Sequence, residues 1–184
     1  MTSTRPATTS EVPSRRADDI GQRFGRLGLP AGRLSQQELE QVACQVAASP
    51  ELWQGLVVDS PGKRWWLVLC RTAAYEVRVL SWEFDQSSGW HDHGGSSGRY
   101  VVTEGILREQ SRGDDGLSVT KSRHLAGDHG SFGPGPVEHV MHEEGEPAVS
   151  IHAYSPPLSN LTLYDLTSFG FVAGRLGPDD QRQL

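Results

Sequence analysis

Residues 65–107 of the 184-residue chain read WWLVLCRTAAYEVRVLSWEFDQSSGWHDHGGSSGRYVVTEGIL, and this stretch decides the fold. Apolar and polar side chains alternate with a period of two on both sides of the motif His91-Asp92-His93, which is typical of half-buried β-strands. Clusters of Gly, Pro, Asp and Ser separate such segments. Strands are expected over 65–71, 75–82, 99–107, 117–125, 148–154 and 161–166. Several short strands at this spacing indicate an all-β sandwich or barrel.

The N-terminal part has a different composition. Residues 1–16 are rich in Ser, Thr, Pro and Arg with few apolar side chains, so a disordered tail is expected. Ser35 and Glu38 form a capping-box pattern, and apolar residues follow at helical spacing, which predicts an amphipathic helix over 36–48 packed on the outside of the sheet. The chain is therefore divided into a tail (1–16), a helical segment (17–62), a β domain (63–170) and a C-terminal extension (171–184).

Charge and composition exclude several classes of partner. The formal net charge is −6, so the chain lacks the basic footprint of a protein that binds nucleic acid or an anionic membrane. No apolar run approaches the ~18 residues of a transmembrane helix, and the N-terminus lacks the apolar core of a signal peptide, so a cytoplasmic location is expected. Cys44 and Cys70 give no disulfide framework or zinc signature. A monomer is expected.

His91 and His93 are the first candidate metal ligands. Side chains two residues apart project from the same face of a strand, so the two imidazoles can bind one ion together. A third ligand is needed, and the pair Glu138-His139, which follows a turn-rich Gly-Pro-Gly-Pro run, offers one. The alternative is that the two histidines are solvated residues at a strand edge.

The sequence resembles the cysteine dioxygenase family of cupins. One half of the match is the segment 82–105, with His91, His93 and Gly98. The other is 147–157, PAVSIHAYSPP, which is similar to the family's Ser-x-His-x-Tyr-Ser-Pro-Pro signature. The resemblance covers about residues 63–165 and implies a cupin jelly-roll barrel with the N-terminal helices packed outside.

The resemblance implies a site of three histidines, with His139 as the third ligand and His142 as a less favoured candidate. Cupins commonly place a glutamate after the second histidine, but Gly98 stands at that position. Without a carboxylate the ion would keep its full +2 charge and bind a thiolate readily. The ligands alone do not distinguish iron from zinc. The resemblance favours Fe(2+).

Ser150, His152 and Tyr154 alternate along one expected strand and therefore share a face. The resemblance implies a catalytic role, in which His152 forms a hydrogen bond with Tyr154 and the tyrosine hydroxyl points at the substrate. The alternative is a half-buried strand with satisfied polar groups. In animal members of the family a cysteine at the position of Gly98 is linked to this tyrosine, so Tyr154 is expected to be unmodified.

The substrate-binding arginine of the family has no evident counterpart. The family holds the substrate carboxylate with an arginine on a strand before the His-x-His motif, where this chain has Leu67 or Trp66. Arg64 and Arg71 are the candidate replacements, and Trp66 is a candidate for lining the pocket. Weak recognition of a carboxylate is therefore expected.

Two functions follow from this comparison. The first is an iron-dependent thiol dioxygenase that converts cysteine, or a related small thiol such as 3-mercaptopropionate, to its sulfinate with O2. The second is a metal-binding cupin without catalysis, acting as a sensory or binding module. An arginine close to the position of the substrate carboxylate would favour the first.

Overall fold

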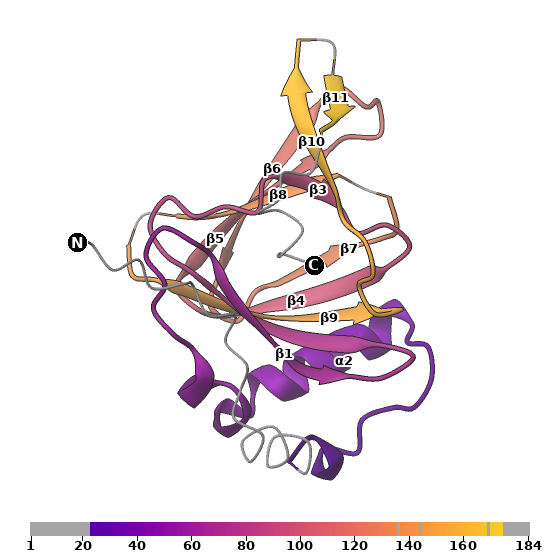
Figure 1. Cartoon of the computed structure of the whole chain (residues 1–184), viewed down its shortest axis with the longest axis vertical. Helices are drawn as coiled ribbons and strands as arrows, with labels where there is room; N and C mark the ends of the chain where they lie inside the picture. The colour runs from indigo at the N-terminus through magenta and orange to yellow at the C-terminus, as the bar shows by residue number, and fades with distance from the viewer. Residues whose placement is uncertain (1–22, 136, 144, 169, 175–184) are drawn as a thin grey trace, which may run out of the picture.

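The computed structural model describes residues 23–135, 137–143, 145–168 and 170–174. Two antiparallel sheets face one another (Figure 1). The first has the strand order β1-β2-β9-β4-β7 and the second β11-β10-β3-β8-β5-β6. No helix in the described part of the chain is long and apolar enough to cross a membrane.

The strands are β1 (Trp65–Arg71), β2 (Glu76–Trp82), β3 (Trp90–Asp92), β4 (Ser97–Glu104), β5 (Ile106–Arg112), β6 (Val119–Leu125), β7 (His129–Phe132), β8 (Glu138–His142), β9 (Ala148–Ser155), β10 (Thr162–Thr167) and β11 (Gly170–Ala173). The helical elements include α2 (Gln36–Ala47) and the short 3-10 turns η1 (Pro50–Leu52) and η2 (Gln54–Leu56). Two antiparallel sheets in this arrangement fit the expected jelly roll.

The inner strands β2 and β9 of the first sheet are buried on both faces, because α2 and the segments beside it cover one face and the second sheet covers the other. All residues of β2 and β9 are buried. Val77 and Val79 belong to the apolar cluster that includes the buried side of α2, whereas Leu80 and Trp82 belong to the cluster between the sheets. Alternate residues of β2 therefore face the helix and the barrel interior.

Helix α2 begins as the sequence predicts. Ser35 accepts a hydrogen bond from the backbone of Glu38, whose side chain accepts one from the backbone of Ser35, so the capping box is complete. The buried side chains Leu39, Val42, Ala43 and Val46 form its inner face. The helix packs against β4 and β9 (Figure 1).

The expected strand 99–107 is two strands in different sheets. Gly105 separates β4 from β5 with a φ of 70°, so the chain turns out of the first sheet there. The short strands β7, β8 and β11 were not expected, and β3 was expected only as a strand carrying His91, without bounds. These four strands are three to five residues long and rich in His and Gly, so they carry little alternation of apolar side chains. The expected tail 1–16 and residues 175–184 of the expected extension lie outside the described residues.

We expect Gly105→Ala to destabilise the protein more than Gly116→Ala. Both glycines have left-handed backbone, with φ of 70° and 72°, which costs an L-residue about 1–2 kcal/mol. Only at Gly105 would the new Cβ clash, at 2.7 Å from the Cα of Ala148 and from the carbonyl oxygen of Pro147. Overpacking should add about 1–3 kcal/mol. Urea unfolding of the two variants measures the difference, and equal losses would show that β9 shifts freely.

Candidate metal centre and catalytic pocket

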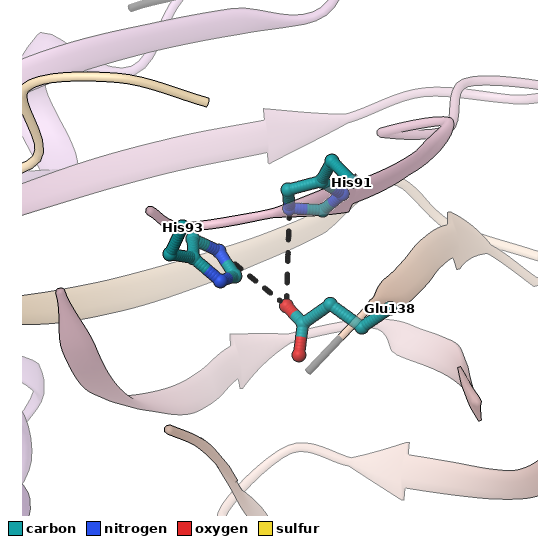
Figure 2. A group of neighbouring side chains, drawn as sticks. All are labelled: His91, His93 and Glu138. Carbon is teal, nitrogen blue, oxygen red and sulfur yellow. Dashed lines mark ion pairs between the residues drawn. The ribbon is translucent and has the colours of Figure 1, made fainter. Parts of the chain in front are cut away.

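Three buried side chains of the second sheet meet at one point. Strands β3 and β8 pair with His91 opposite Glu138, and His93 directly follows β3. The Nε2 atoms of His91 and His93 lie 3.9 Å and 3.6 Å from Oε1 of Glu138. Figure 2 shows both imidazoles turned toward the carboxylate. His91, His93 and Glu138 form the one group of potential metal ligands of this kind among the described residues.

Burial sets the charges of these three groups. Burial lowers the pKa of His91 to about 4, against the effect of a hydrogen bond with the carbonyl of Gly89. Burial also holds the pKa of His93 well below its usual value, so both rings are neutral at pH 7. For Glu138, burial and the nearby charge of Glu109 raise the pKa well above the ordinary carboxyl range. A carboxylate in this position needs a cation beside it.

The distances from the carboxylate to the two imidazoles suit one divalent ion. Two atoms that bind the same ion with bonds of about 2.1 Å can lie at most about 4.2 Å apart, and both His–Glu distances meet this limit. Two histidines and a carboxylate that leave other positions open are the ligand set of many non-haem iron(II) enzymes. His91 is also oriented for binding, because Nδ1 lies 3.0 Å from the carbonyl of Gly89 and Nε2 faces the centre.

The third member of the cluster is Glu138, which corrects the expectation of His139. Adjacent residues of a strand point to opposite faces, so only one of the two can face the barrel interior. The ring of His139 packs instead against Trp90, with centroids 5.3 Å apart. The less favoured candidate, His142, forms a hydrogen bond with the carbonyl of Glu146. The expected site of three histidines without a carboxylate is therefore replaced by one with a carboxylate.

Strand β9 supplies the second group of polar side chains, as the sequence predicts. Ser150, His152 and Tyr154 share its inner face and form a hydrogen-bonded row. Oγ of Ser150 lies 2.9 Å from Nε2 of His152, and Nδ1 of His152 lies 3.4 Å from the hydroxyl of Tyr154. The indole N–H of Trp82 donates to Oγ of Ser150 at 2.9 Å. The row of hydrogen bonds therefore starts from the indole N–H of Trp82, which can donate but cannot accept.

The hydrogen bonds of this row begin at Trp82. Burial, with the charges of Arg64 and Arg78, lowers the pKa of His152 to about 3, so its ring is neutral and carries one hydrogen. The hydroxyl of Ser150 accepts from Trp82 and can still either donate to Nε2 of His152 or accept from it. When the imidazole hydrogen is on Nδ1, it faces the oxygen of Tyr154, and the tyrosine hydrogen points away from His152.

Gly98 lies opposite Tyr154 across the β4–β9 pair. A Cβ at Gly98 would lie 2.0 Å from Cζ of Phe132, so the phenyl ring fills the space that a side chain there would need. The same ring stacks on His93, with centroids 3.8 Å apart and planes 15° apart. Phe132 therefore links the tyrosine side of the pocket to the metal side, a role that sequence reasoning missed because β7 was not expected.

A narrow cavity of about 30 Å³ joins the two groups, which admits only a small ligand. Its lining includes His91, His93, Glu138, His152 and Tyr154. Of the candidates for substrate binding, Arg64 and Trp66 also line it. Arg71 is not in the lining, has a side chain 49 % exposed and forms an ion pair with Glu76.

Arg78 is the lining residue that sequence reasoning missed. It lies in β2 between Val77 and Val79, and a signal was present in the sequence, because a charged residue within a buried strand is almost never fully buried unless it is paired. Burial raises the pKa of Tyr154 to about 12, while the charge of Arg78 acts in the opposite direction. The tyrosine is therefore a protonated donor at neutral pH.

Comparisons with known proteins agree with this fold. A Klebsiella pneumoniae protein with a double-stranded β-helix domain is 21% identical, with a TM-score of 0.53 over 60% of this chain and 86% of that one. The protein TT1209 from Thermus thermophilus is 18% identical, with a TM-score of 0.50 over 56% and 93%. Both show the fold alone.

Similarity in sequence identifies the family of this chain. Cysteine dioxygenase type 1 of Danio rerio is 30% identical over 102 residues, which are 50% of this chain and 50% of that protein. The chain thus spans about half the length of this curated relative. The family model for cysteine dioxygenase type I matches residues 33–167, which include both sheets' inner strands and every residue of the metal cluster. The chain therefore belongs to the cysteine dioxygenase type I family.

Proposed function

We propose that this protein is an iron(II)-dependent thiol dioxygenase that converts a small thiol to its sulfinate with O2. The observation that carries the proposal is the shared cavity. A candidate metal cluster, His91, His93 and Glu138, and a protonated tyrosine, Tyr154, line the same narrow space. Family membership supports the same activity.

The proposed reaction needs no further reductant. A thiolate and O2 give a sulfinate, both oxygen atoms are incorporated, and the sulfur loses the four electrons that O2 gains. Iron(II) held by His91, His93 and Glu138 would supply the redox chemistry that O2 needs to react with a thiolate. The two rings are neutral through burial and are thus ready to bind a cation without first losing a proton.

The row of polar residues on β9 positions one proton. In this proposal His152 carries its hydrogen on Nδ1 and directs it at the oxygen of Tyr154, 3.4 Å away, so that the tyrosine hydroxyl donates toward the cavity. A positioned donor of this kind stabilises negative charge that develops on oxygen or sulfur of the reacting group. Burial excludes water around the donor and strengthens this interaction.

The second candidate function is a metal-binding cupin without catalysis. The absence of an arginine at Leu67 and Trp66 favours it. Arg64 and Arg78 line the cavity, however, so an arginine is available from other positions. This observation favours the thiol dioxygenase over a metal-binding cupin without catalysis.

We expect iron-loaded protein to consume one O2 for each sulfinate formed. The measurement is O2 uptake with 3-mercaptopropionate or L-cysteine, with the sulfinate quantified by mass spectrometry and the metal by elemental analysis. The control is His93→Ala, which should lose both metal and turnover. Metal binding without O2 uptake for any thiol would favour the metal-binding cupin without catalysis. If the protein contains zinc and not iron after aerobic purification and reloading with metal, the assignment of iron(II) as the cofactor is wrong.

A further inference from the structure

Tyr100 is a buried tyrosine of the barrel interior that the proposed reaction does not use. It lies on β4 directly opposite His152 of β9, and it is fully buried. The phenol ring stacks on the imidazole of His152, with ring centres 5.0 Å apart and planes 17° apart. Stacking at this separation is a favourable arrangement of two aromatic rings. Tyr100 therefore contacts the face of a ring whose two nitrogens belong to the hydrogen-bonded row of β9.

A buried carboxylate holds the hydroxyl end of Tyr100. The hydroxyl donates to Oε2 of Glu109 at 2.5 Å, and burial together with the charge of Glu109 raises the pKa of Tyr100, so the phenol keeps its hydrogen. Glu109 is itself held in place, since Oε1 accepts from the hydroxyl of Ser111 at 2.9 Å and Oε2 lies 3.3 Å from Nε2 of His124. Burial acts to raise the pKa of Glu109, but hydrogen bonds with these three partners lower it, so the carboxylate is charged at neutral pH. The contact between Tyr100 and Glu109 is thus a charge-assisted hydrogen bond, which is stronger than one between neutral groups.

The backbone of β7 leaves room for the phenol ring. Gly130 of β7 lies opposite Tyr100 in the β4–β7 pair (Figure 1). A Cβ at Gly130 would lie 2.0 Å from Cε1 of the tyrosine, so a larger residue there would displace the ring. Gly130 does not have left-handed backbone, so an alanine at this position changes the space and not the strand conformation. The place of the ring is therefore set by β7 beside it and by Glu109 at its hydroxyl.

The hydrogen bonds of His152 do not by themselves fix its ring. The contact of Nδ1 with the Tyr154 hydroxyl is 3.4 Å long, beyond the usual range for a hydrogen bond from nitrogen to oxygen. The hydroxyl of Ser150 can donate to Nε2 or accept from it, so it does not select a tautomer. A rotation of the imidazole about its bond to Cβ would move Nδ1 away from Tyr154. The stacked ring of Tyr100 opposes this rotation, because the closely packed face of the imidazole would have to leave its neighbour.

We propose that Tyr100, anchored by Glu109, fixes the plane of the His152 imidazole and thereby directs its Nδ1 at Tyr154. Tyr100 is a positioning residue, because it acts through His152 and is not among the residues that line the cavity. Its effect on turnover rests on the function proposed above, whereas its effect on His152 does not. The ring makes the contact and the hydroxyl only anchors the ring, so loss of the ring should have the larger effect.

Nitrogen NMR of the imidazole rings in metal-free protein tests the proposal without turnover, because it reports which nitrogen of a neutral histidine carries the hydrogen. The signals of His152 are assigned by comparison with His152→Gln. One tautomer of His152 should dominate in wild type, whereas Tyr100→Leu should give a mixture of the two. Tyr100→Phe keeps the ring and loses the anchor, so it should give a smaller change. Tyr75→Leu is the matched control, since it removes a buried tyrosine ring from the helix side of the sheet and should leave the His152 signals as in wild type.

Turnover of the iron-loaded protein gives the second measurement. Tyr100→Leu should keep its metal and lower kcat about 10- to 100-fold with KM nearly unchanged, because displacement of a catalytic group by about 1 Å can cost 10²-fold. Tyr100→Phe should recover most of this loss. A loss of the same size in Tyr75→Leu would show that kcat falls with any cavity in the core, and the proposal would then be wrong.

Gly130→Ala tests the same contact while Tyr100 is unchanged. The new methyl group should displace the phenol ring and give the mixed His152 signals of Tyr100→Leu. In the double variant the alanine should add nothing further, since the ring through which it acts is absent. A further change in the double variant would show that the alanine acts by moving β7, and would contradict the proposal.

If Tyr100→Leu fails to fold, the His152 signals of Gly130→Ala and Tyr100→Phe decide. Signals that stay as in wild type in the Tyr100 and Gly130 variants would overturn the proposal, whatever happens to turnover. Signals that change as expected in a protein that oxidises no thiol would leave the role of Tyr100 intact and refute the dioxygenase alone.

Discussion

Glu138→Gln is expected to lose nearly all bound metal, whereas His139→Ala is expected to keep it. Glutamine has the shape of glutamate but lacks the negative charge that the cation neutralises. Changes to residues that merely contact a ligand cost about 10- to 100-fold in metal affinity, so loss of a ligand that carries charge should exceed this range. Elemental analysis of the purified proteins, followed by titration of the metal-free forms with iron(II), measures the effect.

The pair of variants is a test of strand register. Glu138 and His139 are neighbours on β8, and only Glu138 faces His91 across the β3–β8 pair. His93→Ala serves as a positive control, since it removes a member of the cluster on the other strand. Metal retained in Glu138→Gln and lost in His139→Ala would contradict the structure and restore the site of three histidines.

Tyr154→Phe is expected to keep its metal and lose about 10²-fold in the rate of sulfinate formation. The variant removes one positioned hydroxyl donor, and donors of this kind commonly contribute about 10²–10³-fold. The phenyl ring can still pack against Phe132, whose ring centre lies 5.5 Å from that of Tyr154, so the fold should be preserved. Steady-state O2 uptake coupled to sulfinate measurement reports the loss, and elemental analysis reports the metal.

Two further variants separate catalysis from packing. Tyr75→Phe is the control, because Tyr75 is buried in the apolar cluster on the helix side of the sheet and not in the cavity. Ser150→Ala should give a smaller loss than Tyr154→Phe, since it removes a hydrogen-bond partner of His152 but leaves the tyrosine hydroxyl in place. A rate in Tyr154→Phe equal to that of Tyr75→Phe would make Tyr154 a packing residue.

Local patterns in the sequence determined the parts of this protein that depend on near neighbours. The capping box at Ser35 predicts where helix α2 begins, because its hydrogen bonds join residues three apart. The period of two predicts that Ser150, His152 and Tyr154 share a face, and they do. The same rule brings His91 and His93 together at the candidate metal centre. The match to the family's signature, which identified the family, is local as well.

Tertiary structure alone decided which residues complete the pocket. A slip of one residue in the pairing of two strands moves every side chain to the other face. The register of β3 against β8 therefore places Glu138, and not His139, beside His91, although both residues are candidate ligands in the sequence. Pairing of β4 with β7 placed Phe132 over Gly98, and the face of β2 that looks into the barrel brought in Arg78 while Arg71 stayed outside. These outcomes depend on contacts between segments far apart in the chain, which periodicity within one segment does not encode.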